Sequence, residues 1–199
     1  MSTHKAHFEK DTFYFITLTC YKWLNLFEVS DIYDYFPFWF KKLKDKHVHL
    51  CGYVIMPNHL HLIIYLENTA EHLNTIFSES KRFLAYEIVK RLKETDQNDL
   101  LNILRDGVQE NEKIKGKKHQ VFRLSFDAKP VDEVQVANIL DYIHHNPVSG
   151  KWTLVEDFAL YPHSSADFYE NGGEPKFGLI DYRSVMEIDS SMNSESSFE

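Results

Sequence analysis

The alternation of hydrophobic and polar positions predicts three strands in the first third of the chain. Residues 13 to 21, FYFITLTCY, are rich in β-branched and aromatic side chains, as strands commonly are. Two further apolar runs, HVHLCGYVIM at 47 to 56 and HLHLIIYL at 59 to 66, are separated only by Pro57 and Asn58. A Pro-Asn pair between two apolar runs is a turn signal, so the sequence predicts a β-hairpin.

Helical spacing of apolar residues predicts three helical regions. Between the first strand and the hairpin the apolar positions recur at helical spacing, and Pro37 in their midst predicts a kink or two short helices. Residues 69 to 94 predict one long helix. A further helix is expected to begin at the capping residue Asp132, to reach about His145 and to stop before Pro147.

The remaining segments complete a single domain over residues 1 to 183. Residues 95 to 120 are polar, with one short helical patch, and are expected to form an inserted, partly mobile connection. Residues 121 to 126 predict a short strand, and residues 184 to 199 an acidic, disordered tail. The order strand, helix, hairpin, helix, helix predicts an α+β fold in which helices cover an antiparallel sheet.

The apolar runs and the cysteines indicate the cellular compartment in which the protein is expected. The apolar runs are too short to span a membrane, and the first residues, MSTHKAHFEK, lack the apolar core of a signal peptide. The two cysteines, Cys20 and Cys51, stand in strand-like segments and are expected to be buried thiols in a reducing compartment. We therefore expect a cytoplasmic protein without a membrane partner.

The charge distribution weighs against a generally basic surface. The net charge is −8, whereas nucleic-acid-binding domains usually carry a basic footprint. The tail from residue 184 has four acids and no base, which accounts for half of that charge. Lysine clusters elsewhere leave room for a local basic surface, although lysines on a helix or loop more commonly serve only solvation.

Two His-x-His triplets are the first candidates for a metal site. With 11 histidines in 199 residues, roughly 0.6 such triplets are expected by chance. Residues i and i+2 of a strand share one face, so either pair, His47 with His49 or His59 with His61, is able to converge on one ion. A two-residue hairpin loop would place the two pairs on opposite faces, which argues against a four-histidine site. The residues alone do not choose between the pairs.

The helix predicted before Pro147 offers further side chains that would join one of these histidine pairs in a site. Tyr142 and Asn146 are four residues apart and therefore project from the same helical face. They offer a phenol and an amide oxygen. Alternatively, Tyr142 packs its ring at the helix end and Asn146 caps the helix, and the residues alone leave this choice open.

Several segments together resemble one known family. YVIMPNHLHLII resembles the HUH motif region (histidine, hydrophobic residue, histidine) of single-tyrosine insertion-sequence transposases, and YIHHNPV resembles the tyrosine helix of their REP-associated branch. FYFITLTCY, ESKRFLAYEI and YPHSSADFY are similar to the first strand, the segment after the HUH strand and the C-terminal Ser-Ser-Ala motif of that branch. The resemblance spans about residues 8 to 170.

The resemblance implies a ferredoxin-like fold, with the HUH motif on a central strand and the tyrosine on a C-terminal helix. It also implies a homodimer that cleaves and rejoins single-stranded or hairpin DNA through a 5′-phosphotyrosine. By motif, Tyr142 would be the nucleophile, and His59, His61 and Asn146 would hold a divalent metal ion, typically magnesium or manganese. His47 and His49 match nothing in the motif. Candidate phosphate contacts are the basic residues Lys81, Arg82, Lys113, Lys115, Lys117 and Lys118.

The sequence also departs from the family pattern. Relatives commonly carry a Trp-Gln stretch and then an Asp-His or Asn-His pair before the tyrosine helix, where this chain has Val121-Phe122 and Asp127-Ala128. Together with the acidic charge, this departure suggests an alternative to the nuclease, a catalytically silent protein that binds DNA hairpins. A zinc site unrelated to DNA would need a further strong ligand near the histidines, and the sequence supplies none clearly.

Overall fold

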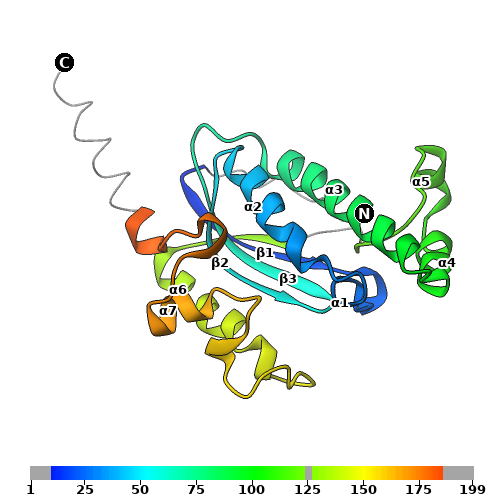
Figure 1. The fold of residues 1–199 in the computed structure, drawn as a ribbon. Helices are drawn as coiled ribbons and strands as arrows, with labels where there is room; N and C mark the ends of the chain where they lie inside the picture. Colours follow the sequence, from blue (N-terminus) through cyan, green and yellow to red (C-terminus); the bar gives the residue numbers. More distant parts are fainter. Residues whose placement is uncertain (1–9, 124–126, 186–199) are drawn as a thin grey trace.

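A four-stranded antiparallel sheet forms the centre of the protein (Figure 1). The computed structural model describes residues 10–123 and 127–185. Its strands lie in the order β2-β3-β1-β4, which is the order of the ferredoxin-like fold read from the other edge. The predicted α+β class and ferredoxin-like sheet are confirmed. The strands are β1 (Thr12–Thr19), β2 (Val48–Met56), β3 (His59–Leu66) and β4 (Asp127–Val131).

Helices cover both faces of this sheet. In Figure 1, α2 and α3 lie over one face, and α6 and α7 lie over the other. No helix in the described ranges is long and apolar enough to cross a membrane. The α-helices are α1 (Leu26–Val29), α2 (Phe36–Lys44), α3 (Leu73–Glu94), α4 (Asn98–Asp106), α5 (Glu110–Ile114), α6 (Glu133–His144) and α7 (Ala166–Asn171). Short 3-10 helices are η1 (Tyr21–Trp23), η2 (Ile32–Tyr35), η3 (Asn146–Val148), η4 (Phe158–Leu160) and η5 (Lys176–Gly178).

Strand alternation divides the core into two clusters. On β3, Leu60, Leu62 and Ile64 face the larger cluster, which α2 and α3 complete. The intervening residues Ile63 and Tyr65 face the smaller cluster beneath α6. His59 and His61 have the same parity as Ile63, so the period-2 rule places them on the α6 face. The histidine pair therefore lies on the sheet face covered by α6, the helix that carries Tyr142.

Local signals around α6 behave as the sequence predicts. The Asp132 carboxylate accepts from the Gln135 backbone N–H at 2.8 Å, and the Gln135 side chain accepts from the Asp132 N–H at 3.1 Å, a reciprocal capping box. The helix ends at His144, and Pro147 lies in η3. Two short helices, η2 and α2, likewise follow each other here, and Pro37 lies in the first turn of α2.

A β-bulge in β2 overturns one geometric prediction. His49 lies opposite Tyr65 and Leu50 opposite Ile64, but Gly52 lies opposite Ile63, so Cys51 is an extra residue. The extra residue reverses the alternation, and His49 therefore shares the sheet face of His59 and His61. The prediction of opposite faces is wrong for His49.

The second histidine pair nevertheless remains separate from the first. His47 and His49 both contact the Glu67 carboxylate at the far end of β3, the His47 Nδ1 at 2.9 Å. The structure thus gives this pair an acidic partner of its own, and the expectation that the four histidines do not form one site holds.

The segment from 95 to 120 is more structured than the predicted polar connection. It contains the two helices α4 and α5, which lie beyond the end of α3 in Figure 1. Leu104 is fully buried in the larger core cluster, and Val108 is buried as well. The amphipathic face of α4 therefore anchors this insertion to the core.

The fourth strand lies later than the sequence predicts. In the segment expected to be a strand, Phe122 forms only an isolated bridge with Cys20, and residues 124 to 126 lie outside the described residues. The strand β4 instead pairs Asp127 through Val131 with β1, and Pro130 is tolerated because β4 is an edge strand. Most of the predicted disordered tail also lies outside the described residues, although Val185 is buried.

Candidate functional site

The hairpin turn at Pro57-Asn58 sets the positions of the two candidate metal ligands. Met56 lies opposite His59 and Val54 opposite His61, which confirms the predicted two-residue loop. The two imidazole centroids are 4.8 Å apart, with an angle of 79° between the ring planes. The residues are only 6% and 7% exposed. Two rings this close on one strand face can present their nitrogens to one ligand.

Hydrogen bonds from neighbouring side chains orient both rings. The Asn58 amide nitrogen donates to the Trp23 carbonyl at 3.1 Å, which directs its Oδ1 toward His59 Nδ1 at 2.7 Å. We therefore assign the Nδ1–H tautomer to His59, with the lone pair on Nε2. His61 Nδ1 is held by the Thr17 hydroxyl at 2.9 Å. Each ring thus has a hydrogen-bond partner at Nδ1, so a metal ion would be bound through Nε2.

Burial keeps both imidazoles neutral. It lowers the pKa of His59 to about 4, an effect that a hydrogen bond with Asn146 opposes and the charge of Lys151 reinforces. Burial, together with the charge of His59, lowers the pKa of His61 to about 3. A metal ligand must be deprotonated, so neutral imidazoles at physiological pH suit metal binding.

The helix α6 brings Tyr142 to this pair. The Tyr142 ring lies 5.8 Å from the His61 ring, centroid to centroid. Phe15 of β1 supports both, stacking on His61 at 5.3 Å and meeting Tyr142 edge-on at 6.5 Å. Tyr142 is 57% exposed, so a ligand in solvent can reach the phenol. Residues some 80 positions apart in the chain therefore share one site.

Asn146 takes part in the site and in the helix end at once. Its amide nitrogen donates to the Tyr142 carbonyl at 2.9 Å, which satisfies a carbonyl that the helix leaves open. Its side chain also lies near His59, where it opposes the lowering of the histidine pKa by burial. The capping role and the proposed ligand role are therefore compatible, because the amide nitrogen serves the first and leaves the oxygen for the second.

A divalent ion would fit this donor set. His59 and His61 would supply neutral nitrogens, and Asn146 an amide oxygen. Within residues 10–123 and 127–185, no group of three or more histidine, cysteine, aspartate or glutamate side chains is placed to hold a metal. The set is thus unlike a closed structural zinc site with four strong ligands, and it leaves positions for a phosphate oxygen and water.

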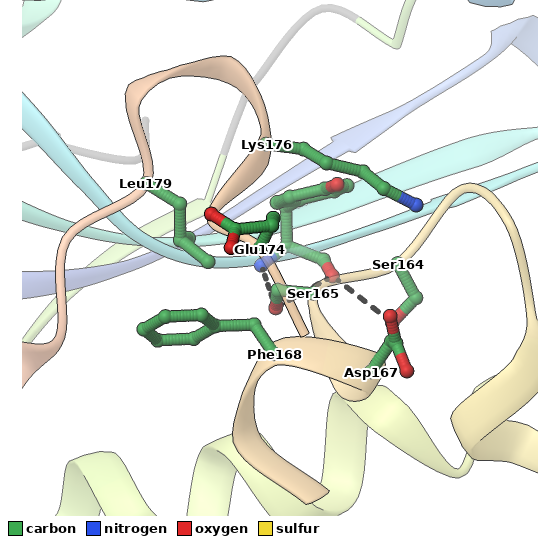
Figure 2. A pocket seen from close by; sticks show the side chains of 8 residues that line it. Ser164, Ser165, Asp167, Phe168, Glu174, Lys176 and Leu179 are labelled. Atoms are coloured by element: carbon green, nitrogen blue, oxygen red, sulfur yellow. Dashed lines mark hydrogen bonds between the residues drawn. The ribbon is translucent and has the colours of Figure 1, made fainter. Parts of the chain in front are cut away.

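The end of α6 is anchored to β2 through the Ser-Ser-Ala segment. The buried His144 contacts the Ser165 Oγ through Nε2 at 2.8 Å, and that Oγ also accepts from the Tyr53 backbone N–H at 2.9 Å. Figure 2 shows Ser165 beside Ser164, whose hydroxyl donates to the Tyr53 carbonyl at 3.3 Å. The pocket beside them holds about 10 Å³, room for one water, so we assign it no ligand.

Replacement of Ser165 by alanine is expected to destabilise the protein by about 2 to 6 kcal/mol. It leaves the Tyr53 N–H and the His144 ring without their partner, at about 1 to 3 kcal/mol each. Ser164→Ala is the matched control, since it leaves His144 paired and should lose less. Urea denaturation of both variants measures the difference, and equal losses would contradict the proposed anchor.

The protein is expected to lose stability as pH falls below about 6.5. Burial lowers the pKa of His144 to about 4, as it lowers those of His59 and His61. The unfolded chain therefore binds more protons than the folded one below its ordinary histidine pKa. Each of the three histidines should lower the free energy of unfolding by about 2 kcal/mol at pH 5 relative to pH 8. Urea denaturation at the two pH values measures this, and a pH-independent midpoint would contradict it.

The predicted phosphate contacts lie on α3 and near α5. Lys81 donates to the Arg123 carbonyl at 3.3 Å, and burial lowers its pKa to about 8. The Arg82 guanidinium lies over the Phe83 ring. Lys113 pairs with Glu110, Lys115 and Lys117 both pair with Glu112, and Lys118 is exposed. The acidic partners reduce the positive potential that three of these lysines would otherwise present.

Two residues near the histidines were not singled out by sequence reasoning. Lys151 lies close enough to His59 for its charge to lower the histidine pKa. Trp23 meets His59 edge-on, with ring centroids 5.7 Å apart. Lys151 follows Asn146 by five residues, which is its only sequence signal. Trp23 has none, because its contact depends on how η1 turns away from β1.

Comparison with known proteins gives matches among solved structures. No family model matches the chain, and no curated protein matches its sequence. A REP-associated tyrosine transposase bound to a REP hairpin is similar with a TM-score of 0.55 and 19% identity, over 90% of this chain and 92% of that one. A putative transposase from Deinococcus radiodurans R1 has a TM-score of 0.37 and 16% identity, over 73% of this chain and 97% of that one.

The first of these similarities bears on the fold alone, and the second is too low to carry an argument. At 19% identity the likeness shows the fold, and any chemistry or DNA ligand of this chain is a matter for a proposal. The resemblance seen in the sequence motifs is nevertheless confirmed at the level of architecture. The chain folds as a REP-associated tyrosine transposase does.

Proposed function

We propose that this protein is a transposase-like endonuclease that cleaves and rejoins single-stranded DNA, with Tyr142 as nucleophile. The observation that carries the proposal is the 5.8 Å separation between the Tyr142 and His61 rings. An exposed phenol beside two neutral, oriented imidazoles suits attack on a phosphodiester. The neighbouring fold, which in that protein holds a REP hairpin, supports DNA as the substrate class.

In the proposed reaction, the Tyr142 Oη attacks the scissile phosphorus. The Oη–P bond forms and the bond from phosphorus to the 3′ oxygen breaks, which gives a 5′-phosphotyrosine and a 3′ hydroxyl that receives the phenolic proton. The phosphoester retains the bond energy, so a 3′ hydroxyl can reverse the step and rejoin strands. His59, His61 and Asn146 would hold a magnesium or manganese ion, which when bound supplies charge stabilisation at the phosphate oxygens.

The second candidate function is a catalytically silent protein that binds DNA hairpins. The observation that favours it is the departure from the family pattern near the site. Ala128 stands where relatives often carry a histidine, and the preceding Asp127 lies opposite Thr17, whose hydroxyl holds His61. An exposed carboxylate there would repel a phosphate. The silent protein would bind hairpins without cleavage, and its binding would survive His59→Ala.

One experiment separates the two functions. The protein is incubated with labelled DNA hairpins that carry single-stranded arms of randomised sequence, in magnesium or in manganese. The endonuclease gives a protein–DNA adduct that survives denaturing electrophoresis, and sequencing of the attached strands locates the cut. Retention of hairpins on the native protein without any adduct in either metal would establish the silent alternative.

Lys151→Ala is expected to weaken single-stranded DNA binding and to reduce its salt dependence. Each phosphate contact to a single strand contributes about −0.7 to the slope of log K against log salt. Loss of one contact should therefore make the slope shallower by about 0.7, whereas Lys151→Arg should retain it. Fluorescence anisotropy over a salt series measures the slope. Lys118→Ala serves as a comparison. A shallower salt slope in Lys118→Ala but not in Lys151→Ala would contradict a phosphate contact by Lys151.

We extend the proposal to a homodimer, as the family resemblance implies. Sedimentation equilibrium tests it with the protein alone and with a bound hairpin. A single species of monomer mass in both conditions would rule the dimer out, without bearing on the chemistry of Tyr142.

A further inference from the structure

The side chains around the histidines lie in a definite order. Tyr142 contacts the ring of His61, and Trp23 contacts the ring of His59. The axis of α6 runs from His61 toward His59, because Tyr142 contacts His61 and Asn146, one turn further along, lies near His59. His61 lies opposite Thr17 and His59 opposite Thr19, and Trp23 follows shortly after the end of β1. Tyr142 and Trp23 therefore flank the histidine pair from its two ends.

Trp23 is exposed at this end of the pair although its ring is large and apolar. It is 52% exposed, whereas Trp39 is buried and Trp152 is half-buried. Its backbone has a φ of 58°, and that of the preceding Lys22 a φ of 52°, a region that bulky residues rarely adopt. The Asn58 side chain holds the Trp23 carbonyl in this conformation. Such strain is characteristic of functional sites.

The geometry of phosphoryl transfer gives the two ends different roles. The attacking oxygen and the leaving oxygen lie roughly in line through the phosphorus. If the phenol of Tyr142 attacks from the His61 end, the 3′ oxygen departs toward the His59 end. The nucleotide that keeps this 3′ oxygen therefore lies on the side of Trp23 and Lys151, which supply an aromatic face and a positive charge.

We propose that Trp23 is a stacking platform for the base immediately 5′ of the scissile phosphate. This inference rests on the proposed function, because the direction of attack from Tyr142 decides which base reaches Trp23. Aromatic platforms bind unpaired bases through their π-faces with little sequence preference. Trp23 would hold the strand that ends in the 3′ hydroxyl after cleavage, and would keep that hydroxyl in place for rejoining.

The test uses Tyr142→Phe protein, which binds DNA but cannot form the adduct. A hairpin is selected for binding to this protein from the randomised pool, and the fluorescent base 2-aminopurine is placed at each single-stranded position in turn. Stacking on Trp23 quenches its emission. Trp23→Ala and Trp23→Gly remove the ring, and glycine also relieves the positive φ. Phe83→Ala is the matched control, since Phe83 is also 52% exposed and lies on α3.

We expect one position to be quenched, and to lose its quenching in both Trp23 variants but not in Phe83→Ala. That position should lie immediately 5′ of the bond that the wild-type protein cuts. An abasic site there should weaken binding about tenfold with Trp23 present and cause no further loss in Trp23→Ala. Melting curves followed by circular dichroism show that the variants remain folded.

The other outcomes separate this inference from the proposed function. Normal adduct formation with no position responding to Trp23 overturns the platform and leaves the nuclease intact. A responding position on the 3′ side of the cut overturns the assigned direction. A Trp23-dependent position in a protein that forms no adduct in magnesium or manganese leaves a binding platform and refutes the nuclease. Absence of any DNA binding refutes both.

Discussion

Tyr142→Phe is expected to abolish the covalent adduct while DNA binding persists. The substitution removes only the Oη that attacks phosphorus, and it leaves the ring contacts with His61 and Phe15 in place. Loss of a catalytic nucleophile lowers rates by about 10⁴-fold or more. Because Tyr142 is 57% exposed, the free energy of unfolding should change by less than about 0.5 kcal/mol. Activity and stability should therefore separate cleanly.

Adduct formation on a labelled hairpin measures this effect, and anisotropy measures binding by the same proteins. Tyr86→Phe is the matched control, because Tyr86 is 64% exposed and lies on α3. It should form the adduct at the wild-type rate. An undiminished adduct in Tyr142→Phe would assign the nucleophile to another residue, and the proposed reaction would be wrong.

Local patterns were sufficient to predict most of the elements that position the site. The hairpin follows from two apolar runs with two turn residues between them, and its register follows from that loop length. The start of α6 follows from a capping pair within three residues. These features depend on contacts between near neighbours in sequence, and such contacts can be read from residue types and spacing.

Other features depend on tertiary packing and were missed. The bulge at Cys51 brings Gly52 against α6, where an added Cβ would lie 2.4 Å from Leu140 Cδ2. An isolated glycine within a strand is a signal for a bulge or a close approach, and this signal at Gly52 was not used, so the side on which His49 lies was predicted wrongly. Similarly, β4 contains a proline and mostly exposed positions, and it forms a strand because the edge of β1 offers it partners.

In the candidate site, too, some features were predictable from local sequence and others depend on tertiary packing. The two histidines are recognisable because they occupy one short strand, and Tyr142 was connected to them only through the family resemblance. The proximity of the phenol to His61 arises from the packing of α6 against the sheet. Trp23 and Lys151 reach His59 from η1 and from the loop after η3, and nothing in their own segments indicates a partner.

The second large effect is expected at the histidines. His59→Ala and His61→Ala should each lower the rate of adduct formation by at least about 10²-fold, because each removes a group that would hold the charge-stabilising ion. They should also weaken binding of Mn²⁺ to the protein in the absence of DNA, which electron paramagnetic resonance measures directly. The metal readout separates loss of a ligand from loss of DNA affinity.

The other triplet offers a control of the same residue type on the same sheet face. His49 lies opposite Tyr65 and contacts Glu67, away from Tyr142, so His49→Ala should leave both adduct formation and Mn²⁺ binding unchanged. If His49→Ala reduced Mn²⁺ binding as much as His61→Ala, the ion would be held by His49 and Glu67. A phosphate bound there would lie beyond the reach of the phenol, and the attack by Tyr142 would lose its physical basis.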